Sequence, residues 1–284
     1  MSIITGIKYS LSFVCLFQFS ASVATAATPQ SADLQQWVDH PIRSAEDRAR
    51  DPYRHPVETL NFFGLRPDMQ VLEIWPARGW YTEILAPYLK GQGKLTLATF
   101  RSDDGSMTDD RKIFWSRITE KLNQHLTQNA SHFGPVQQLE FDPPAYMYMG
   151  PVNHYDMVLS FRNSHIWNEQ GYLLDVFRAV FDVLKPGGVF GLVDHRASKV
   201  SEISSSAVEG YLDESYVIHV AELAGFQLVA QSEINANPKD TKDHPKGVYA
   251  LPPTLAMGLV DRSKYLAIGE SDRMTLKFVK PTLQ

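Results

Sequence analysis

The stretch VLEIWPARGWYTEIL, residues 71–85, contains a strand, a tight turn and the start of a helix. VLEI (71–74) is a short apolar run bounded by turn signals, which is typical of a buried strand. YTEIL (81–85) begins an amphipathic pattern that predicts a helix. Glycine-rich turns between a parallel strand and a helix hold nucleotides. Only Gly79 is a clear glycine here, so the question is whether this turn still holds a ligand.

The rest of the chain alternates strands with helices. Strands are predicted at 94–100, 135–141, 155–161, 189–195, 227–233 and 274–280, and helices within 28–64, 106–126, 171–184 and 215–226. Such alternation indicates an open, mainly parallel α/β sheet with helices on both faces. The sequence shows neither an internal repeat nor a second core. We therefore expect one domain, residues 27–284, with a long polar connection at 235–272.

The N-terminus has the pattern of a secretory signal peptide. Lys8 precedes an apolar run at 11–19, and Ala24-Thr25-Ala26 follows it as an exit motif. The run is too short for a membrane span of roughly 20 residues. We therefore predict cleavage after residue 26, no stable membrane anchor afterwards, and a periplasmic or secreted protein. Cys15, the only cysteine, lies inside this run, so the mature chain would have no disulfide and no thiolate ligand.

The composition argues against several classes of protein. The chain has 284 residues, 44% of them hydrophobic, which suits a substantial core. Its formal net charge is −5 and neither sign forms a long run, which disfavours nucleic acid as a partner. The nine histidines show no metal-binding spacing, so no metal is expected. The G-x-S-x-G and Walker A motifs are missing as well.

Three motifs together resemble the class I S-adenosylmethionine-dependent methyltransferases. They are VLEIWPARGWYTEIL (71–85), YDMVLSFRNSHIW (155–167) and FDVLKPGGVFGLVDHR (181–196). The resemblance covers residues 56–281 and is strongest to exported bacterial members, whose first loop is richer in glycine. It implies a Rossmann-like, seven-stranded, mostly parallel sheet with helices on both faces and an antiparallel last strand. It also implies S-adenosylmethionine as cofactor and a small-molecule methyl acceptor, which the sequence does not identify. The oligomeric state also stays open.

The resemblance places the cofactor at the first motif. Glu73 would accept hydrogen bonds from loop amides or from the cofactor's ammonium group. Arg78 stands where glycine is usual. It would either strain the backbone by about 1–2 kcal/mol in a left-handed conformation or contact a ligand carboxylate, and a plain exposed turn is the alternative. The other implied cofactor residues in this motif are Trp75, Pro76, Ala77, Gly79, Tyr81 and Thr82.

The next two strand ends are less typical of the family. The usual acidic residue at the end of strand two is missing, so either Asp103 or Asp104 would hold the ribose or the ribose would be held in another way. Asp142, after strand three, would contact the adenine amino group, although a solvated aspartate is an equal alternative. After strand four, Arg162 and Asn163 would hold either the acceptor or the cofactor's polar end, and Phe161 would form a wall of the pocket beside the cofactor.

The catalytic prediction rests on the ends of strands four and five. His165 is a candidate base, and Asp194 and His195 would join it. The alternative is a salt-bridge network that caps the sheet. We expect Trp167 and Arg196 to contact the acceptor, and the 235–272 connection to act as a lid. The inward residues of that lid would be His244, Tyr249 and Arg262.

A non-catalytic function is the competing interpretation. The missing glycines and the predicted export favour a binding protein on a degenerate methyltransferase scaffold. The charged segments FRNSH (161–165) and VDHR (193–196) favour an enzyme, because a pure scaffold does not need them.

Overall fold

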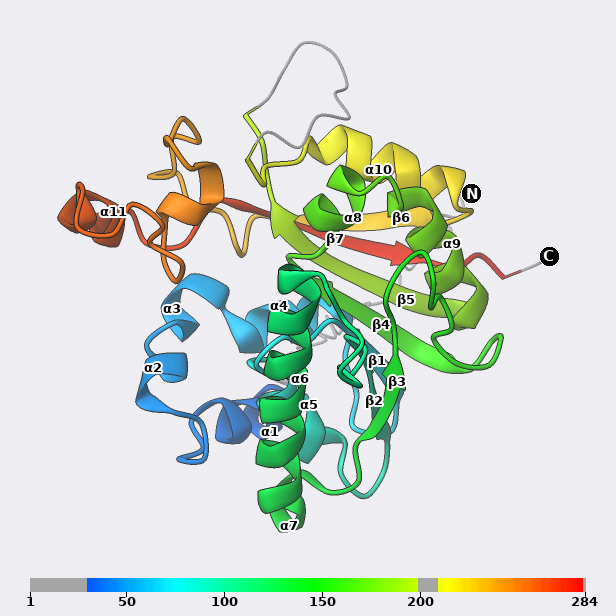
Figure 1. Cartoon of the computed structure of the whole chain (residues 1–284). Coiled ribbons are helices and arrows are strands. Elements are labelled where there is room, and N and C mark those ends of the chain that lie inside the picture. The colour runs from blue at the N-terminus through cyan, green and yellow to red at the C-terminus, as the bar shows by residue number, and fades with distance from the viewer. Residues whose placement is uncertain (1–29, 199–208, 283–284) are drawn as a thin grey trace, which may run out of the picture.

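The fold is a seven-stranded sheet with the order β3-β2-β1-β4-β5-β7-β6 (Figure 1). The computed structural model describes residues 30–198 and 209–282, so the predicted signal peptide lies outside it. The strands are β1 Gln70–Ile74, β2 Lys94–Thr99, β3 Gln137–Glu140, β4 Tyr155–Phe161, β5 Leu184–His195, β6 Gln227–Ser232 and β7 Arg273–Val279. Strands β1 to β5 pair in parallel, and β7 is antiparallel to both β5 and β6. The predicted fold class is confirmed.

Helices pack on both faces of this sheet. They are α1 Gln30–Val38, α2 Ala45–Arg48, α3 Asp51–Arg54, α4 Pro56–Phe63, α5 Thr82–Leu89, α6 Asp110–Gln128, α7 Ala130–Phe133, α8 Ser164–Glu169, α9 Leu173–Val183, α10 Glu214–Leu223 and α11 Arg262–Ile268. One core contains Trp167, Val176 and Val217 from α8, α9 and α10. The other contains Leu60 and Ile84 from α4 and α5. The sheet therefore separates two apolar layers, as doubly wound folds require.

Several predicted boundaries shift. The segment 28–64 is helical as expected but forms four short helices, and Ser44 caps α2 by accepting a hydrogen bond from the Asp47 amide. The prediction missed α8. It also expected the turn 185–188 to precede strand five, whereas β5 already starts at Leu184. The connection 235–272 contains a 3-10 turn, Gly247–Ala250, and α11, which lies beyond the end of the sheet in Figure 1.

The strand order positions a ligand site. The chain runs outward from β1 to β2 and β3, then returns to place β4 on the other side of β1. Ligands of such sheets bind at the carboxyl ends of the strands where this reversal occurs. Here that point lies between β1 and β4, next to the turn that follows Ile74.

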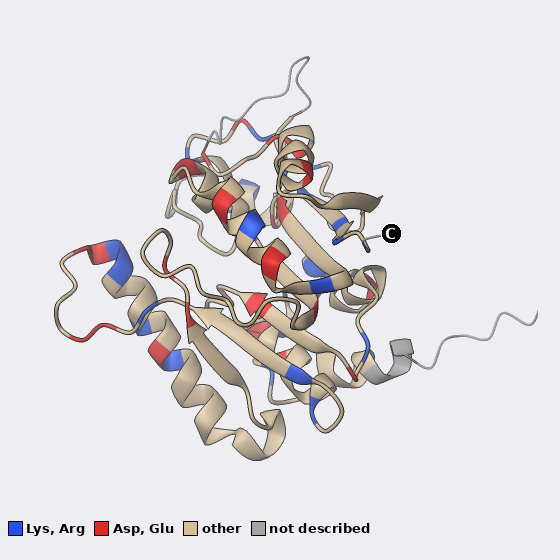
Figure 2. Cartoon of the chain, turned by 90° about the vertical axis from the view of Figure 1, so that its right-hand side faces the viewer, with Lys and Arg blue, Asp and Glu red and all other residues tan. Residues whose placement is uncertain are grey.

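Charges of both signs share the same elements. Figure 2 shows Lys and Arg interspersed with Asp and Glu, for example along the long helix α6. Among the described helices, none combines the length and apolar character needed to cross a bilayer.

Candidate cofactor and active site

The turn after β1 keeps a glycine-like backbone without the glycines. Trp75, Ala77 and Gly79 have φ values of 45°, 53° and 86°, in the left-handed region that favours glycine. A Cβ added to Gly79 would lie 2.6 Å from the Leu122 side chain, so this position cannot take a larger residue. Arg78 is not among the residues with positive φ, is exposed and lines neither cavity. The predicted left-handed strain at Arg78 is therefore wrong, because the left-handed positions alternate and skip it. The exposed side chain agrees with the alternative of a plain turn.

We expect an Ala77→Gly variant to unfold at a higher temperature than the wild type. Relief of the left-handed strain at alanine should stabilise the fold by about 1 kcal/mol. Ala179→Gly in α9 is the matched control and should destabilise by about the same amount, since helical glycine is unfavourable. Thermal unfolding measures both, and destabilisation by Ala77→Gly would contradict the assigned turn geometry.

Two adjacent cavities open at the switch point. The larger has a volume of about 230 Å³ and the smaller about 90 Å³. Both are lined by Trp75, Phe100, Trp115 and Ile166. Together they reach the lower end of the roughly 300–1,000 Å³ range of small-molecule sites. We refer to the two cavities together as the cleft, and Trp75 lines both of them.

The smaller cavity brings together most of the predicted cofactor residues. Its lining includes Glu73, Trp75, Pro76, Ala77, Tyr81, Phe161, Arg162 and Asn163. The Asn163 amide donates to the Ile74 carbonyl at 2.8 Å, which ties the end of β4 to the end of β1. Tyr81 stacks on Phe161 with ring centroids 3.6 Å apart. Thr82 is not in the lining, and its hydroxyl donates to the Glu73 carboxylate at 2.6 Å.

Glu73 is a buried carboxyl group in the wall of this cavity. It is 2% exposed, and burial raises its pKa from 4.5 to about 7, although the Thr82 hydrogen bond opposes the shift. Within the described chain, Glu73 has no basic partner. A carboxyl group held in this way is poised to ionise when a cation arrives beside it.

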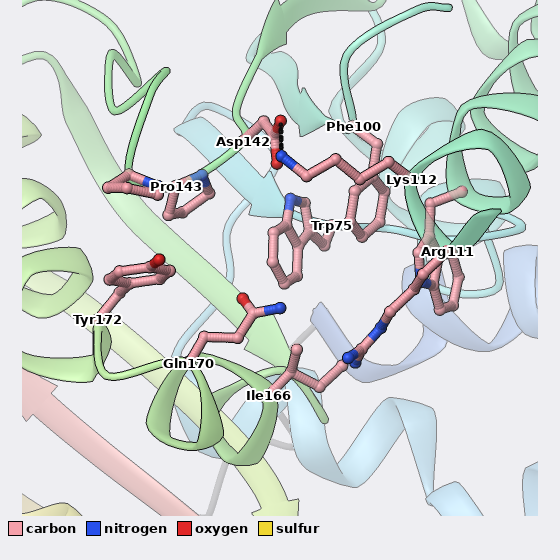
Figure 3. A pocket seen from close by; sticks show the side chains of 11 residues that line it. Trp75, Phe100, Arg111, Lys112, Asp142, Pro143, Ile166, Gln170 and Tyr172 are labelled. Carbon is pink, nitrogen blue, oxygen red and sulfur yellow. Dashed lines mark hydrogen bonds and ion pairs between the residues drawn. The ribbon is translucent and has the colours of Figure 1, made fainter. Parts of the chain in front are cut away.

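The larger cavity has an aromatic wall. Trp75 stacks on Phe100 with centroids 4.4 Å apart, and Phe100 stacks on Trp115 at 5.0 Å. Figure 3 shows Trp75 and Phe100 side by side, with Gln170 and Tyr172 across the cavity. Such a wall suits a planar ring that stacks on aromatic faces.

Asp142 lines the larger cavity, as predicted for a contact to the adenine amino group. Its carboxylate forms an ion pair with Lys112, whose Nζ lies 2.8 Å from Oδ2 (Figure 3). The Trp75 indole also reaches the end of β3, where its Nε1 donates to the Phe141 carbonyl at 2.9 Å. Trp75 therefore lines both cavities and connects the end of β1 to the end of β3.

A hydrogen-bonded cluster joins the ends of β4 and β5. His165 Nδ1 lies 2.9 Å from Asp194 Oδ1, and since a carboxylate only accepts, Nδ1 carries the proton. Asp194 is fully buried and also accepts from the backbone amides of His165 and His195. The His195 ring contacts the Ser271 hydroxyl. The three predicted catalytic residues therefore meet, although none of them lines either cavity.

The same three residues offer donor atoms to a metal ion. One donor atom from each lies within 4.8 Å of the others, and two histidines with one carboxylate can bind divalent transition metals. Burial of the cluster and the positive charges around it disfavour a bound cation. Burial, and then His165 and the positive charges of Arg162, Arg273 and Arg54, lower the pKa of His195 well below its ordinary value. A dication would face the same repulsion, so we read this cluster as a hydrogen-bonded network.

Several predicted site residues lie elsewhere. Trp167 is completely buried behind Trp75, in the core rather than in a pocket wall. Arg196 forms ion pairs with Glu214, Glu233 and Asp272, which is the sheet-capping network of the alternative interpretation. Asp103 and Asp104 accept hydrogen bonds within their own loop, from the Gly105 and Ser106 amides, and line neither cavity. The loop turns both aspartates to solvent, which favours the alternative that the ribose is held in another way.

The three residues predicted to face inward from the 235–272 connection differ in their burial and surroundings. His244 is buried and bonded to Asp240 at 2.9 Å, within the connection itself. Arg262 is exposed at the start of α11. Tyr249 lies closer to the site: burial, Glu169 and Asp194 raise its pKa, and Arg111 from the larger cavity opposes this. None of the three lines a cavity, so the structure places none of these predicted inward residues in the cavity walls.

Sequence reasoning missed several lining residues. Trp115 and Arg111 come from α6, and Arg54 comes from α3, well before β1. Phe100 follows β2 directly, and its place at a strand's carboxyl end was a usable signal. No local pattern marks Arg54 or Trp115, because tertiary packing alone brings them to the cleft.

Comparisons with known proteins identify the fold. No family model matches the sequence, and no curated protein matches it. A SAM-dependent methyltransferase from Aquifex aeolicus is 16% identical, with a TM-score of 0.51 over 88% of this chain and 98% of that one. A SAM-dependent methyltransferase from Methanosarcina mazei is 12% identical, with a TM-score of 0.50 over 79% and 98%.

A further similar structure has a different described activity. The [4+2]-cyclase SpnF is 15% identical, with a TM-score of 0.55 over 89% of this chain and 94% of that one. Identities this low establish only the fold, which is the class I methyltransferase fold. Function has to be argued from the site, because one fold supports several reactions.

Proposed function

We propose that this chain is an S-adenosylmethionine-dependent methyltransferase that acts on a small molecule. The observation that carries the proposal is the charge pairing in the smaller cavity. Glu73 and Arg54 both line it and have opposite charges, as the ammonium and carboxylate groups of an amino acid require. Arg54 Nη2 is buried without a hydrogen-bond partner, so it has a donor available for a carboxylate.

The larger cavity fits the remainder of the cofactor. Its stacked Trp75, Phe100 and Trp115 rings would hold an adenine ring, and Asp142 is placed to accept from the exocyclic amine. Bound S-adenosylmethionine would supply a methyl group on a positively charged sulfur. The residues of the chain would bind and orient both reactants, which accounts for much of the rate of such a reaction.

His165 is the proposed proton acceptor for an OH or NH acceptor group. Asp194 fixes its Nδ1, so Nε2 is the ring atom that would take the proton. His165 is only 3% exposed and lines neither cavity, so it would act on an acceptor that reaches beyond the cavity walls. The predicted export to the periplasm or the medium remains part of the proposal. In this setting the enzyme would use cofactor supplied outside the cytoplasm.

Ligand titration tests the proposed function. We expect S-adenosylmethionine and S-adenosylhomocysteine to bind residues 27–284 in calorimetry. Saturation at about 100 times the Kd should raise the free energy of unfolding by about 2.7 kcal/mol. An absence of heat and of thermal stabilisation at millimolar ligand would favour the non-catalytic binding protein instead.

A further inference from the structure

A cluster of arginines surrounds one carboxylate beside the smaller cavity. Arg50 Nε and Arg54 Nε lie 2.7 Å and 3.0 Å from the two oxygens of Glu270, and Arg273 Nη1 lies 3.2 Å from Oε2. Arg54, Arg273 and Glu270 are each 3% exposed. Helix α3 and the start of β7, far apart in sequence, therefore place several like charges against one carboxylate.

A fourth arginine, Arg162, faces the same cluster. It follows β4 directly, and both it and Arg54 line the smaller cavity. Burial lowers the pKa of Arg162 to about 10, and Glu270 and Asp194 oppose this effect. Burial and then repulsion from Arg162 lower the pKa of Arg54. The arginines therefore carry more positive charge than the nearby carboxylates of Glu270 and Asp194 neutralise.

Some N–H donors of this cluster have no hydrogen-bond acceptor among the described residues. Nη2 of Arg54 and Nη2 of Arg50 are buried without a partner. In the part of the chain that the structure describes, no residue accepts a hydrogen bond from the Arg162 guanidinium. Buried polar groups normally have partners, and unpaired ones are costly. The Trp80 ring lies 4.6 Å from Arg54 Cζ and covers one face of that guanidinium, so its edge is what remains for a ligand.

The backbone at Arg162 is held in an unfavourable conformation. Its φ is 65°, and the Arg162 amide donates to the Val193 carbonyl at 2.7 Å. A left-handed non-glycine residue costs about 1–2 kcal/mol, and such strain concentrates where side chains must be aimed. Here it directs a guanidinium to the cavity.

The cofactor alone would not neutralise these charges. Apart from Glu73, whose raised pKa of about 7 leaves it partly protonated at neutral pH, the four positive charges of Arg50, Arg54, Arg162 and Arg273 face the two carboxylates of Glu270 and Asp194. S-adenosylmethionine carries a carboxylate, an ammonium and a sulfonium, so it adds a net positive charge. A cationic cofactor beside buried arginines leaves the excess larger.

We propose that Arg162, with Arg50 behind it, binds a carboxylate or phosphate group of the methyl acceptor, which makes the acceptor a small anion, while Arg54 faces the cofactor's carboxylate. The anion site follows from the arginine cluster alone, whereas its assignment to the acceptor rests on the proposed function. The acceptor's anion would supply the missing negative charge and the hydrogen-bond acceptors. It would also hold the acceptor at the smaller cavity, which Arg162 lines.

Calorimetry with simple anions tests this site. Inorganic phosphate and acetate are titrated separately into residues 27–284 at constant ionic strength, with and without saturating S-adenosylhomocysteine. We expect at least one of these anions to bind both the free and the S-adenosylhomocysteine-bound protein. Arg162→Met should weaken that binding roughly tenfold or more, and the exposed Arg178→Met should leave it unchanged. A thermal unfolding experiment on each variant serves as the control that it folds.

Different outcomes separate the two proposals. Anion binding that disappears when S-adenosylhomocysteine binds would assign the arginines to the cofactor's own carboxylate. That result would overturn the anionic acceptor and leave the proposed function intact. Anion binding that Arg162→Met does not weaken, or no binding of either anion, would also overturn it. Failure of S-adenosylhomocysteine itself to bind would overturn the proposed function, and with it the assignment of the anion to a methyl acceptor.

Discussion

A Glu73→Gln variant is expected to bind S-adenosylmethionine roughly 10- to 100-fold more weakly than the wild type, because a charge-assisted hydrogen bond to the ammonium group is worth about 1.5–3 kcal/mol. The same variant should be more stable without ligand above neutral pH. Burial raises the pKa of Glu73 to about 7, so ionisation of this group disfavours the folded state. Calorimetry and thermal unfolding at several pH values measure both effects.

The sign of this pH dependence follows from the raised pKa. Below about pH 4.5 Glu73 is protonated in both the folded and the unfolded state, so its ionisation does not lower the free energy of unfolding. As pH rises from 4.5 through 7, the unfolded state loses its proton first, so the wild type loses stability, by up to about 3 kcal/mol. The stability advantage of Glu73→Gln should therefore grow across this window and level off above it. Ligand affinity of the wild type should rise over the upper part of the same window.

Glu58→Gln is the matched control, because Glu58 is an exposed glutamate of α4. It should change neither affinity nor the pH profile. A Glu73→Gln protein with unchanged affinity would show that Glu73 is not part of the cofactor site.

Loss of the Glu270 charge is expected to be the most destabilising single change. Glu270→Gln removes the carboxylate that Arg50, Arg54 and Arg273 share. Removal of one partner of a buried ion pair costs about 3–5 kcal/mol, since the remaining charge stays buried. We expect the unfolding midpoint in chemical denaturant to fall accordingly. Guanidinium chloride is a salt, so urea is the suitable denaturant.

The pH dependence of Glu270 is opposite to that of Glu73. Burial alone would raise the pKa of Glu270, but Arg54, Arg273, Arg162 and Arg50 hold it far below its usual range. Its stabilisation is therefore complete above about pH 4.5 and is lost as pH falls towards the depressed pKa. The difference between wild type and variant should stay constant from neutral pH down to about 4.5 and then shrink. Glu222→Gln on the exposed side of α10 is the control, and an equal effect there would refute the role of the cluster.

Local sequence pattern predicted most of the elements. Alternating apolar runs and amphipathic stretches gave every strand of the sheet, because strand and helix burial repeat with different periods. The helix α8 was missed, since six residues are too few for a periodic signal. The residue types of the turn after β1 predict left-handed strain at Arg78, and this prediction is wrong. Backbone dihedrals, which composition does not specify, place the strain at Trp75 and Ala77 instead.

The candidate site was predicted where it depends on strand ends. Glu73, Asp142, Arg162 and Asn163 reach the cleft because the carboxyl ends of parallel strands share one edge of the sheet. Arg196 also follows such a strand end, yet its side chain turns to Asp272 and Glu233. The strand position fixes the location of a residue, but the charges around it decide its partner.

The sequence by itself therefore determined the α/β sheet, its order of elements and the edge where a ligand would bind. Only the tertiary structure decided which side chains form the cleft. Arg54 lies on α3 and Glu270 precedes β7, and they meet across 216 residues of sequence. No periodicity encodes such a contact, because it results from the packing of whole helices and strands on one sheet. The excess positive charge beside the cleft, which leads to an anionic acceptor, is a property of that packing.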